Sequence, residues 1–317
     1  MQTLNIIGAG RVGQTLGRLL TLQGVFALQD VLTNSAGSAQ AACGFIGAGT
    51  PATQLAQMRD ADVWMLAVPD AQIAAVAGTL AAHVQTRTAP PRVEALPAAN
   101  KAVSEQVPAK HATGTPSAAG PYSPIVFHCS GAQSTVLLSP LADLGWQVAS
   151  AHCILSFASV EAAIAQFPGT ACALEGQASA VAALHSAFTT IQARCFEIQS
   201  KGKLLYHAAA VFATNFLPVI QSVAEDAWLA TGVPPELLPD LRNALLTNAV
   251  ANITRLGPAG ALTGPAARGD VAAIARQAEA VTQWDAKAGA AYEALSALAL
   301  RLAKAKTDTS PTPASKS

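Results

Sequence analysis

Near the start of the chain, three glycines stand at G-x-G-x-x-G spacing, directly after a short apolar segment. The glycines are Gly8, Gly10 and Gly13, and residues 4–7 precede them. This pattern predicts a strand, a tight turn and a helix, in which Gly10 leaves room for a pyrophosphate and Gly13 lets the helix pack closely on the strand. Apolar residues at helical spacing follow: Val12, Leu16, Leu19 and Leu20. We therefore predict a dinucleotide site at the helix N-terminus rather than a glycine-rich turn without a ligand.

Composition limits the function classes. The chain has 317 residues, 51% of them hydrophobic, and a formal net charge of +0. This length predicts two domains, and the balanced charge does not favour nucleic acid. The apolar runs look shorter than a bilayer span and no basic-then-apolar leader is visible, so we expect a cytoplasmic protein without a membrane segment. Five cysteines without C-x-x-C spacing suggest reduced thiols.

Short apolar segments after the first helix predict further strands. They are residues 30–33, 63–68, 125–129, 146–151, 171–174 and 195–198. Continuous apolar runs suit parallel strands covered by helices on both faces, so the fold class is α/β, with a doubly wound Rossmann domain over residues 1–200. Asp70 follows Pro69 and is expected to cap the next helix.

Two segments interrupt or extend this pattern. Residues 86–124 contain seven prolines and predict an insertion, either a lid or a surface loop. Residues 201–306 contain helical patterns only and predict an all-helical second domain. Within it we expect a kink at Pro218, a helix end at Gly257 and a helix cap at Asp270. Residues 307–317 are expected to be disordered.

Polar residues follow two of the predicted strands. Ser130 and His152 come where parallel strands end, the edge at which such sheets bind ligands. Ser130 could orient a substrate carbonyl or carboxylate, and His152 could exchange a proton near neutral pH, although each could equally be structural. The pairs His128-Cys129 and His152-Cys153 match no usual ligand spacing, so no metal site is predicted.

The first helix of the second domain carries a second group of candidates. Lys203, His207 and Thr214 lie near one face at spacings of four and seven, with Asn215 just beside them. They could supply a proton during hydride transfer, or they could be satisfied interdomain residues. In the later glycine-containing loop, Arg268 could hold an anionic substrate group or brace a subunit interface.

The residues after the second strand bear on which cofactor is bound. Thr33, Asn34 and Ser35 stand where NAD enzymes place a carboxylate for the ribose 2′-hydroxyl. With hydroxyl and amide groups there and no carboxylate to repel a 2′-phosphate, NADP is favoured over NAD, and Arg11 is the nearby arginine that could pair with that phosphate.

Several motifs together resemble the Rossmann-like proteins that carry domain of unknown function 2520. They are residues 8–13, 67–70, 128–132 and 203–209, Asn215, and residues 262–270. That group is similar to 6-phosphogluconate and 3-hydroxyacid dehydrogenases, pyrroline-carboxylate reductase and ketopantoate reductase. The resemblance implies an NADP-binding Rossmann domain, a helical dimerisation domain and an active site between them, with Val68, Pro69 and Ser130 contacting the cofactor beside Gly8, Gly10, Arg11, Val12 and Gly13.

Two departures from the resemblance stand out. Cys153 follows His152 where the group usually has proline, and residues 33–35 lack the arginine that it commonly has. The expected function is an NADP-dependent oxidoreductase for a small carbonyl, imine or hydroxyacid substrate, acting as a homodimer. The alternative is a nucleotide-binding sensor or regulatory dimer without turnover.

Overall fold

The computed structural model describes residues 1–88 and 123–308, and it divides into two compact units, Met1–Val211 and Phe212–Ser317. The division falls later than the boundary predicted at residue 200, because Lys203 is buried in the first unit. Most of the predicted insertion at 86–124 and of the predicted tail at 307–317 lies outside the described residues. Each unit is described by itself.

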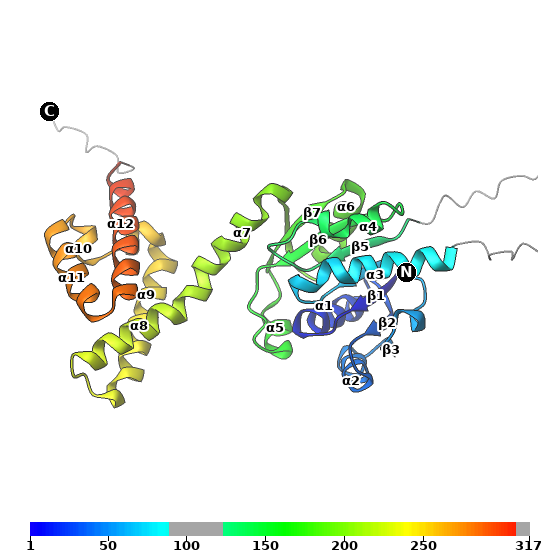
Figure 1. The fold of residues 1–317 in the computed structure, drawn as a ribbon, viewed down its shortest axis with the longest axis horizontal. Helices are drawn as coiled ribbons and strands as arrows, with labels where there is room; N and C mark the ends of the chain where they lie inside the picture. Colours follow the sequence, from blue (N-terminus) through cyan, green and yellow to red (C-terminus); the bar gives the residue numbers. More distant parts are fainter. Residues whose placement is uncertain (89–122, 309–317) are drawn as a thin grey trace, which may run out of the picture. The chain divides into compact units, whose positions relative to one another are not determined.

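The first unit is built on an eight-stranded sheet (Figure 1) with the order β3-β2-β1-β4-β5-β6-β7-β8. The strands are β1 (Thr3–Ile7), β2 (Ala27–Leu32), β3 (Thr50–Ala52), β4 (Val63–Leu66), β5 (Ile125–His128), β6 (Gln147–Cys153), β7 (Ala171–Gly176) and β8 (Arg194–Glu197). Neighbouring strands run parallel except for the antiparallel pair β6 and β7. The predicted α/β fold with a parallel sheet is confirmed.

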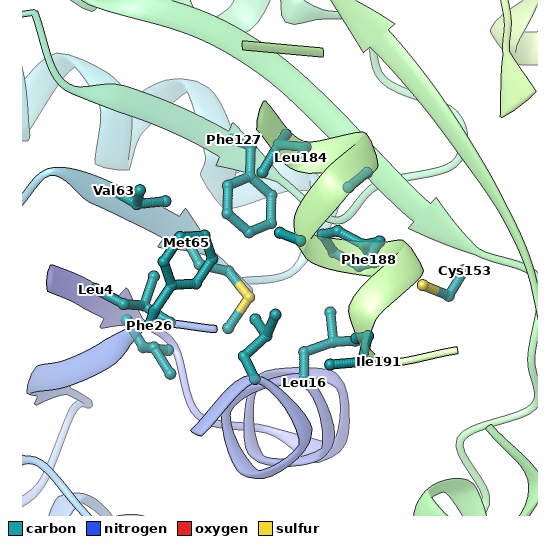
Figure 2. Packing of buried hydrophobic residues seen from close by; sticks show 14 of the residues in the cluster. Leu4, Leu16, Phe26, Val63, Met65, Phe127, Cys153, Leu184, Phe188 and Ile191 are labelled. Carbon is teal, nitrogen blue, oxygen red and sulfur yellow. The ribbon is translucent and has the colours of Figure 1, made fainter. Parts of the chain in front are cut away.

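Helices cover both faces of this sheet. They are α1 (Arg11–Leu22), α2 (Ala36–Ile46), α3 (Ile73–Thr88), α4 (Ser139–Ala142), α5 (Val160–Gln166) and α6 (Ala178–Thr190). Alternating residues of β4 belong to two hydrophobic cores, one on each face of the sheet. Val63 and Met65 pack with α1, α2 and α6, whereas Trp64 and Leu66 pack with α3 and α4. Figure 2 shows the first core, where Leu16 and Phe188 lie around Met65. Each such fully buried side chain contributes roughly 1.5–3 kcal/mol.

A π-helical turn lies at the boundary between the two units. Helix α7 (Lys203–Ala210) passes into a π-helical turn at Val211–Asn215 and then into α8 (Phe216–Ala230). The sequence predicted one helix kinked at Pro218, and the interruption lies one turn before that proline. Proline has no amide for the carbonyl four residues earlier, and its ring crowds that carbonyl, so the preceding turn widens.

The second unit contains α9 (Leu238–Ala261), α10 (Gly264–Ala267), α11 (Val271–Trp284) and α12 (Ala286–Asp308). Gly257 interrupts α9 with a φ of 70°, where the sequence predicted a helix end. Asp270 caps α11 as predicted, because its Oδ1 accepts a hydrogen bond of 3.0 Å from the amide of Ala273.

One helical run carries an unusually apolar surface. Among the described residues, Ser200–Ala230 is long and apolar enough to cross a membrane by length and composition alone, with a mean hydropathy of 1.3. This corrects the expectation that every apolar run is shorter than a bilayer span. Core helices of soluble proteins pass the same test, so this result is weak evidence for a membrane segment. Phe212 and Val219 are 62% and 57% exposed, so the described residues leave this face uncovered.

Candidate active site

The glycine turn between β1 and α1 shows where the fold itself needs glycine. Gly8 has a φ of +88°, and a Cβ there would lie 2.7 Å from the carbonyl oxygen of Ala67. A Cβ on Gly13 would collide with the carbonyl oxygen of Gly8. Gly10 has an ordinary φ of −71° and no neighbouring atom within 4 Å of its Cβ position. The fold therefore requires glycine at Gly8 and Gly13 but leaves open space at Gly10, as a bound pyrophosphate needs.

The start of α1 also suits an anion. No acidic residue lies in its first turn, and no side chain caps it. Its first amides can therefore donate to a phosphate. The guanidinium of Arg11 donates to the carbonyl oxygen of Phe157 at 3.1 Å, so its pairing with a 2′-phosphate stays a prediction.

A cavity of about 350 Å³ opens at the carboxyl ends of β1 and β2. It is lined by Ile7, Leu32, Thr53, Gln54, Leu55, Gln72, Ala75, Val76 and Thr79. It adjoins the glycine turn, because the amide of Gly8 donates to the carbonyl of Leu32 at 2.9 Å. A mainly apolar cavity with a few amide and hydroxyl groups fits a flat heterocycle such as adenine.

Asn34 and Ser35 follow β2. The hydroxyl of Ser35 accepts a 3.2 Å hydrogen bond from the amide of Ser38, so it caps α2. Asn34 is exposed. Their contact with a cofactor stays a prediction.

A second cavity, of about 170 Å³, lies at the carboxyl ends of β5 and β6. Its lining is Val12, Leu16, Asp70, Cys129, Ser130, Gly131, Ala151, His152, Cys153, Leu155, Phe157 and His207. The structure thus brings together three residues that the sequence proposed separately: Ser130, His152 and His207. All of them belong to the first unit.

Ser130 is fixed by its neighbours. Its hydroxyl donates to the carboxylate of Asp70 at 2.7 Å and accepts from the amides of Ala132 and Gln133 at 3.2 and 3.0 Å. The expectation that Asp70 caps the next helix is therefore wrong: no side chain caps the short 3-10 helix Asp70–Gln72 that precedes α3, and the Asp70 carboxylate binds Ser130 instead. Ser130 holds the carboxylate of Asp70 at the cavity wall.

His152 is held from one side by a tyrosine. Its Nδ1 lies 2.8 Å from the hydroxyl of Tyr206, and the two rings meet edge to face with centroids 5.5 Å apart. Burial, with the nearby His207 and Lys203, lowers the pKa of His152 to about 4. Burial raises the pKa of Tyr206 above its usual value. At neutral pH this pair therefore consists of a neutral imidazole and a protonated phenol.

His207 faces His152 across Gly131. The two imidazole centroids are 5.9 Å apart. A Cβ on Gly131 would lie 2.8 Å from His152 Nε2 and 2.8 Å from His207 Nδ1. Within the described structure, the buried Nδ1 of His207 has no hydrogen-bond partner. It is free to bind a group that enters the cavity.

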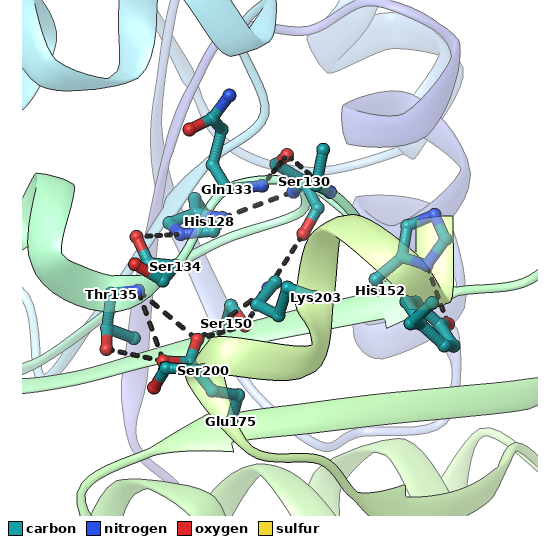
Figure 3. Close-up of polar contacts among 12 residues, drawn as sticks. His128, Ser130, Gln133, Ser134, Thr135, Ser150, His152, Glu175, Ser200 and Lys203 are labelled. Atoms are coloured by element: carbon teal, nitrogen blue, oxygen red, sulfur yellow. Dashed lines mark hydrogen bonds and ion pairs between the residues drawn. The ribbon is translucent and has the colours of Figure 1, made fainter. Parts of the chain in front are cut away.

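Lys203 lies beneath the cavity, in a buried polar network. Its side chain is 1% exposed, and its Nζ donates to the Ser130 carbonyl at 3.0 Å and to Ser150 Oγ at 2.5 Å (Figure 3). Glu175 Oε2 lies 3.6 Å from the ammonium. Burial lowers the pKa of Lys203, and Glu175 opposes that shift. Although Lys203 and His207 are one turn apart, only His207 belongs to the described lining.

Glu175 completes the network. Its carboxylate accepts hydrogen bonds from Thr135 Oγ1 at 2.8 Å, Ser150 Oγ at 2.9 Å and Ser200 Oγ at 2.6 Å. Burial raises its pKa, but these hydrogen bonds and Lys203 outweigh burial, so the net pKa is below the ordinary value. The network joins β6, β7 and the start of α7.

His128 has a fixed tautomer. Its Nδ1 accepts from the amide of Ser130 at 3.2 Å, so its hydrogen is on Nε2, which lies 3.3 Å from the carbonyl oxygen of Ser134. Burial and the charge of Lys203 lower its pKa to about 4. His128 therefore supports the loop that carries Ser130.

Two sequence candidates lie in the second unit. Asn215 accepts a 2.8 Å hydrogen bond from Thr214, and Arg268 ends α10. Their roles at the site stay predictions. Over the described ranges there is no group of three or more His, Cys, Asp or Glu that could hold a metal ion.

Sequence reasoning missed three residues of the site: Asp70, Tyr206 and Glu175. Asp70 stands beside a predicted strand end, a signal that could have placed it there. Tyr206 precedes His207, and its role depends on the strand that carries His152. Glu175 lies on a strand with no distinguishing pattern.

Comparison with known protein families finds two matches, each over part of the chain. Residues 2–100 match the model of a Rossmann-like domain, and residues 170–299 match the model described as Domain of unknown function (DUF2520). No curated protein sequence matches the chain.

Solved structures share this fold. Protein TM1727 from Thermotoga maritima is 21% identical, with a TM-score of 0.67, over 96% of this chain and 99% of that one. A candidate NADP oxidoreductase, BF3122 from Bacteroides fragilis, is 19% identical, with a TM-score of 0.64, over 95% and 98%. Reductive aminase from Aspergillus terreus, in complex with NADPH and ethyl-5-oxohexanoate, is 15% identical, with a TM-score of 0.55, over 95% and 94%. At these identities the likeness concerns the fold.

Replacing Gly131 with alanine is expected to displace both imidazoles, because the new Cβ would lie 2.8 Å from a nitrogen of each. The histidine side-chain signals in NMR spectra should therefore shift. Gly78→Ala is the control, since nothing lies within 4 Å of its Cβ position. Unchanged His152 and His207 signals in Gly131→Ala would contradict the packing described.

Replacing Lys203 with methionine is expected to lower the free energy of unfolding by about 3 kcal/mol, because the Glu175 carboxylate would stay buried without its ammonium partner. Urea unfolding followed by circular dichroism measures this. The double variant Lys203→Met/Glu175→Gln removes both charges and should recover part of the loss. A single variant as stable as the wild type would show that the pair contributes nothing.

Proposed function

We propose that this chain is an NADP-dependent oxidoreductase that transfers hydride to or from a small carbonyl, imine or hydroxyacid compound. The observation that carries the proposal is the open space at Gly10, within a turn whose other two glycines are required by the fold. The turn leads from one cavity, lined by Ile7, to another, lined by Val12, His152 and His207. A bound dinucleotide would need these three parts in this order: an apolar cavity, a phosphate site and a polar cavity.

Several residues would hold the cofactor. The amides after Gly10 would bind the pyrophosphate, and Val68 packs against Gly8 beside Pro69 at the end of β4. When bound, the nicotinamide ring would supply or accept the hydride. The absence of a carboxylate at residues 33–35 supports NADP over NAD. The NADPH named for the reductive aminase agrees with this choice.

The polar cavity would bind the reacting group. His207 Nδ1 has no partner in the described structure, so it can form a hydrogen bond with an oxygen or nitrogen of the substrate. His152 forms the neighbouring wall, and Ser130 orients Asp70. Lys203 donates to the Ser130 carbonyl and acts as a positioning residue, which revises the role of proton donor that the sequence suggested.

An anionic substrate group would have to bind elsewhere. The described lining of this cavity contains no lysine or arginine, and its one carboxylate is that of Asp70. Arg268, in the second unit, remains the candidate for that role. Asn215 remains a candidate orienting residue.

The cofactor proposal is tested with Gly10→Asp. The variant should fold normally, because no atom lies within 4 Å of the Cβ position, and it should bind NADPH at least tenfold more weakly, because a carboxylate would face the phosphates. NADPH fluorescence titration and circular dichroism measure the two properties. Gly44→Asp, an exposed position on α2 with equally open space, is the matched control.

Equal NADPH affinity in wild type, Gly10→Asp and Gly44→Asp would refute the cofactor site. If NADPH binds normally, turnover with a panel of small ketones, cyclic imines and hydroxyacids decides between an enzyme and a sensor. Binding without any turnover would favour the sensor.

We also propose a homodimer formed through the exposed face of α8. Val219 and Ile220 on this helix are 57% and 44% exposed, more apolar surface than a monomer usually leaves uncovered. Sedimentation should find a dimer that Ile220→Asp dissociates at least tenfold more readily. Leu22→Asp, which changes a 59% exposed leucine of α1, should leave the dimer intact. A stable wild-type monomer at micromolar concentration would refute this proposal.

A further inference from the structure

The contact between His152 and Tyr206 joins two elements of the first unit. His152 lies on β6, and Tyr206 lies on α7, three residues after the buried Lys203. Phe196 of β8 packs against Tyr206 on another side, with ring centroids 6.2 Å apart. The phenol ring is therefore held between β6 and β8, and its hydroxyl lies 2.8 Å from His152 Nδ1.

The two ring nitrogens of His152 have different surroundings. Nδ1 contacts the Tyr206 hydroxyl, whereas Nε2 lies near Gly131, on the wall of the polar cavity. A neutral imidazole carries one hydrogen, and the partner of one nitrogen decides which nitrogen has it. A phenol O–H is a stronger donor than an imidazole N–H, and an imidazole nitrogen is a stronger acceptor than a phenol oxygen. The favoured arrangement is Tyr206 donating to Nδ1.

We propose that Tyr206 is a positioning residue that fixes His152 with its hydrogen on Nε2, so that Nε2–H is the donor offered to the oxygen or nitrogen of a reacting C=O or C=N group. This proposal rests on the proposed function only for the identity of the reacting group. The tautomer itself is inferred from the contact between His152 Nδ1 and the Tyr206 hydroxyl, whatever group reacts. His152 then polarises the substrate as a neutral donor, and it does not act as an imidazolium.

The depressed pKa of His152, about 4, agrees with this role, because the ring stays neutral at neutral pH. The raised pKa of Tyr206 agrees too, because the phenol keeps its proton. In the other tautomer, Nε2 would have no hydrogen and could only accept. The phenol hydroxyl thus decides between a donor and an acceptor at the cavity wall.

The experiment is NMR of protein labelled with ¹⁵N at its six histidines, recorded at neutral pH. His152→Gln assigns the His152 signals by their loss. In wild type we expect a protonated Nε2 and an unprotonated Nδ1 for His152. In Tyr206→Phe, which keeps the ring and removes the hydroxyl, this single tautomer should give way to a mixture, while the signals of His128 stay unchanged.

Tyr292→Phe is the matched control, since it removes a tyrosine hydroxyl that donates to Gln277 in the second unit. On any substrate found by the panel, Tyr206→Phe should lower kcat about tenfold, which is the effect expected from the loss of one hydrogen bond. The affinity for NADPH should stay unchanged. A wild-type His152 with its hydrogen on Nδ1, or the same tautomer in Tyr206→Phe, would overturn the proposal. Neither outcome depends on turnover, so a failed cofactor proposal is distinguishable from a failed tautomer assignment.

Discussion

The ion pair between Lys203 and Glu175 is the constraint on which the arrangement of the site depends. Both side chains are almost completely buried, and the ammonium also binds the Ser130 carbonyl and Ser150. A buried charge is costly unless it is paired and hydrogen-bonded, so the start of α7 is confined to the place where these partners meet. Tyr206 and His207 follow on the same helix. Their position at the cavity is therefore a consequence of where Lys203 is held.

Burial is the main influence on the protonation of two imidazoles near the cavity. His128 and His152 both have a pKa lowered to about 4, by burial first and then by nearby positive charge. Lys203 contributes to both shifts although it does not line the cavity. The buried ammonium of Lys203 therefore adds to the effect of burial on the pKa of both imidazoles. The same residue also positions the start of α7.

The sequence predicted the Rossmann domain well because the fold is specified locally. The spacing of Gly8, Gly10 and Gly13 requires a particular turn, and the apolar strands require two covering layers. The positions of the strand ends also identified Ser130 and His152 as site candidates, since the carboxyl ends of parallel strands lie at one edge of the sheet. The helix cap at Asp270 was predictable for the same reason, because a cap acts within one turn.

The remaining features depend on contacts between distant segments. Lys203 and His207 looked equivalent at a spacing of four, yet one reaches the buried Glu175 and the other faces Gly131. Spacing along a helix shows which side chains share a face. It does not show how deeply each of them is buried in the fold. Glu175 and Asp70 were not predictable as partners because their donors, Ser200 and Ser130, lie 25 and 60 residues away.

Glycine illustrates how structure can separate the demands of folding from those of ligand binding. At Gly8 and Gly13 the protein itself fills the space that a side chain would need, and at Gly131 two imidazoles do so. Gly10 has neither a left-handed φ nor a neighbour within 4 Å, so the fold alone gives no reason for glycine there. Glycine in an interior turn has an entropic cost, which a compensating role must offset. Close approach of a phosphate to the backbone supplies that role, and it makes Gly10 the position where a change should affect binding without affecting folding.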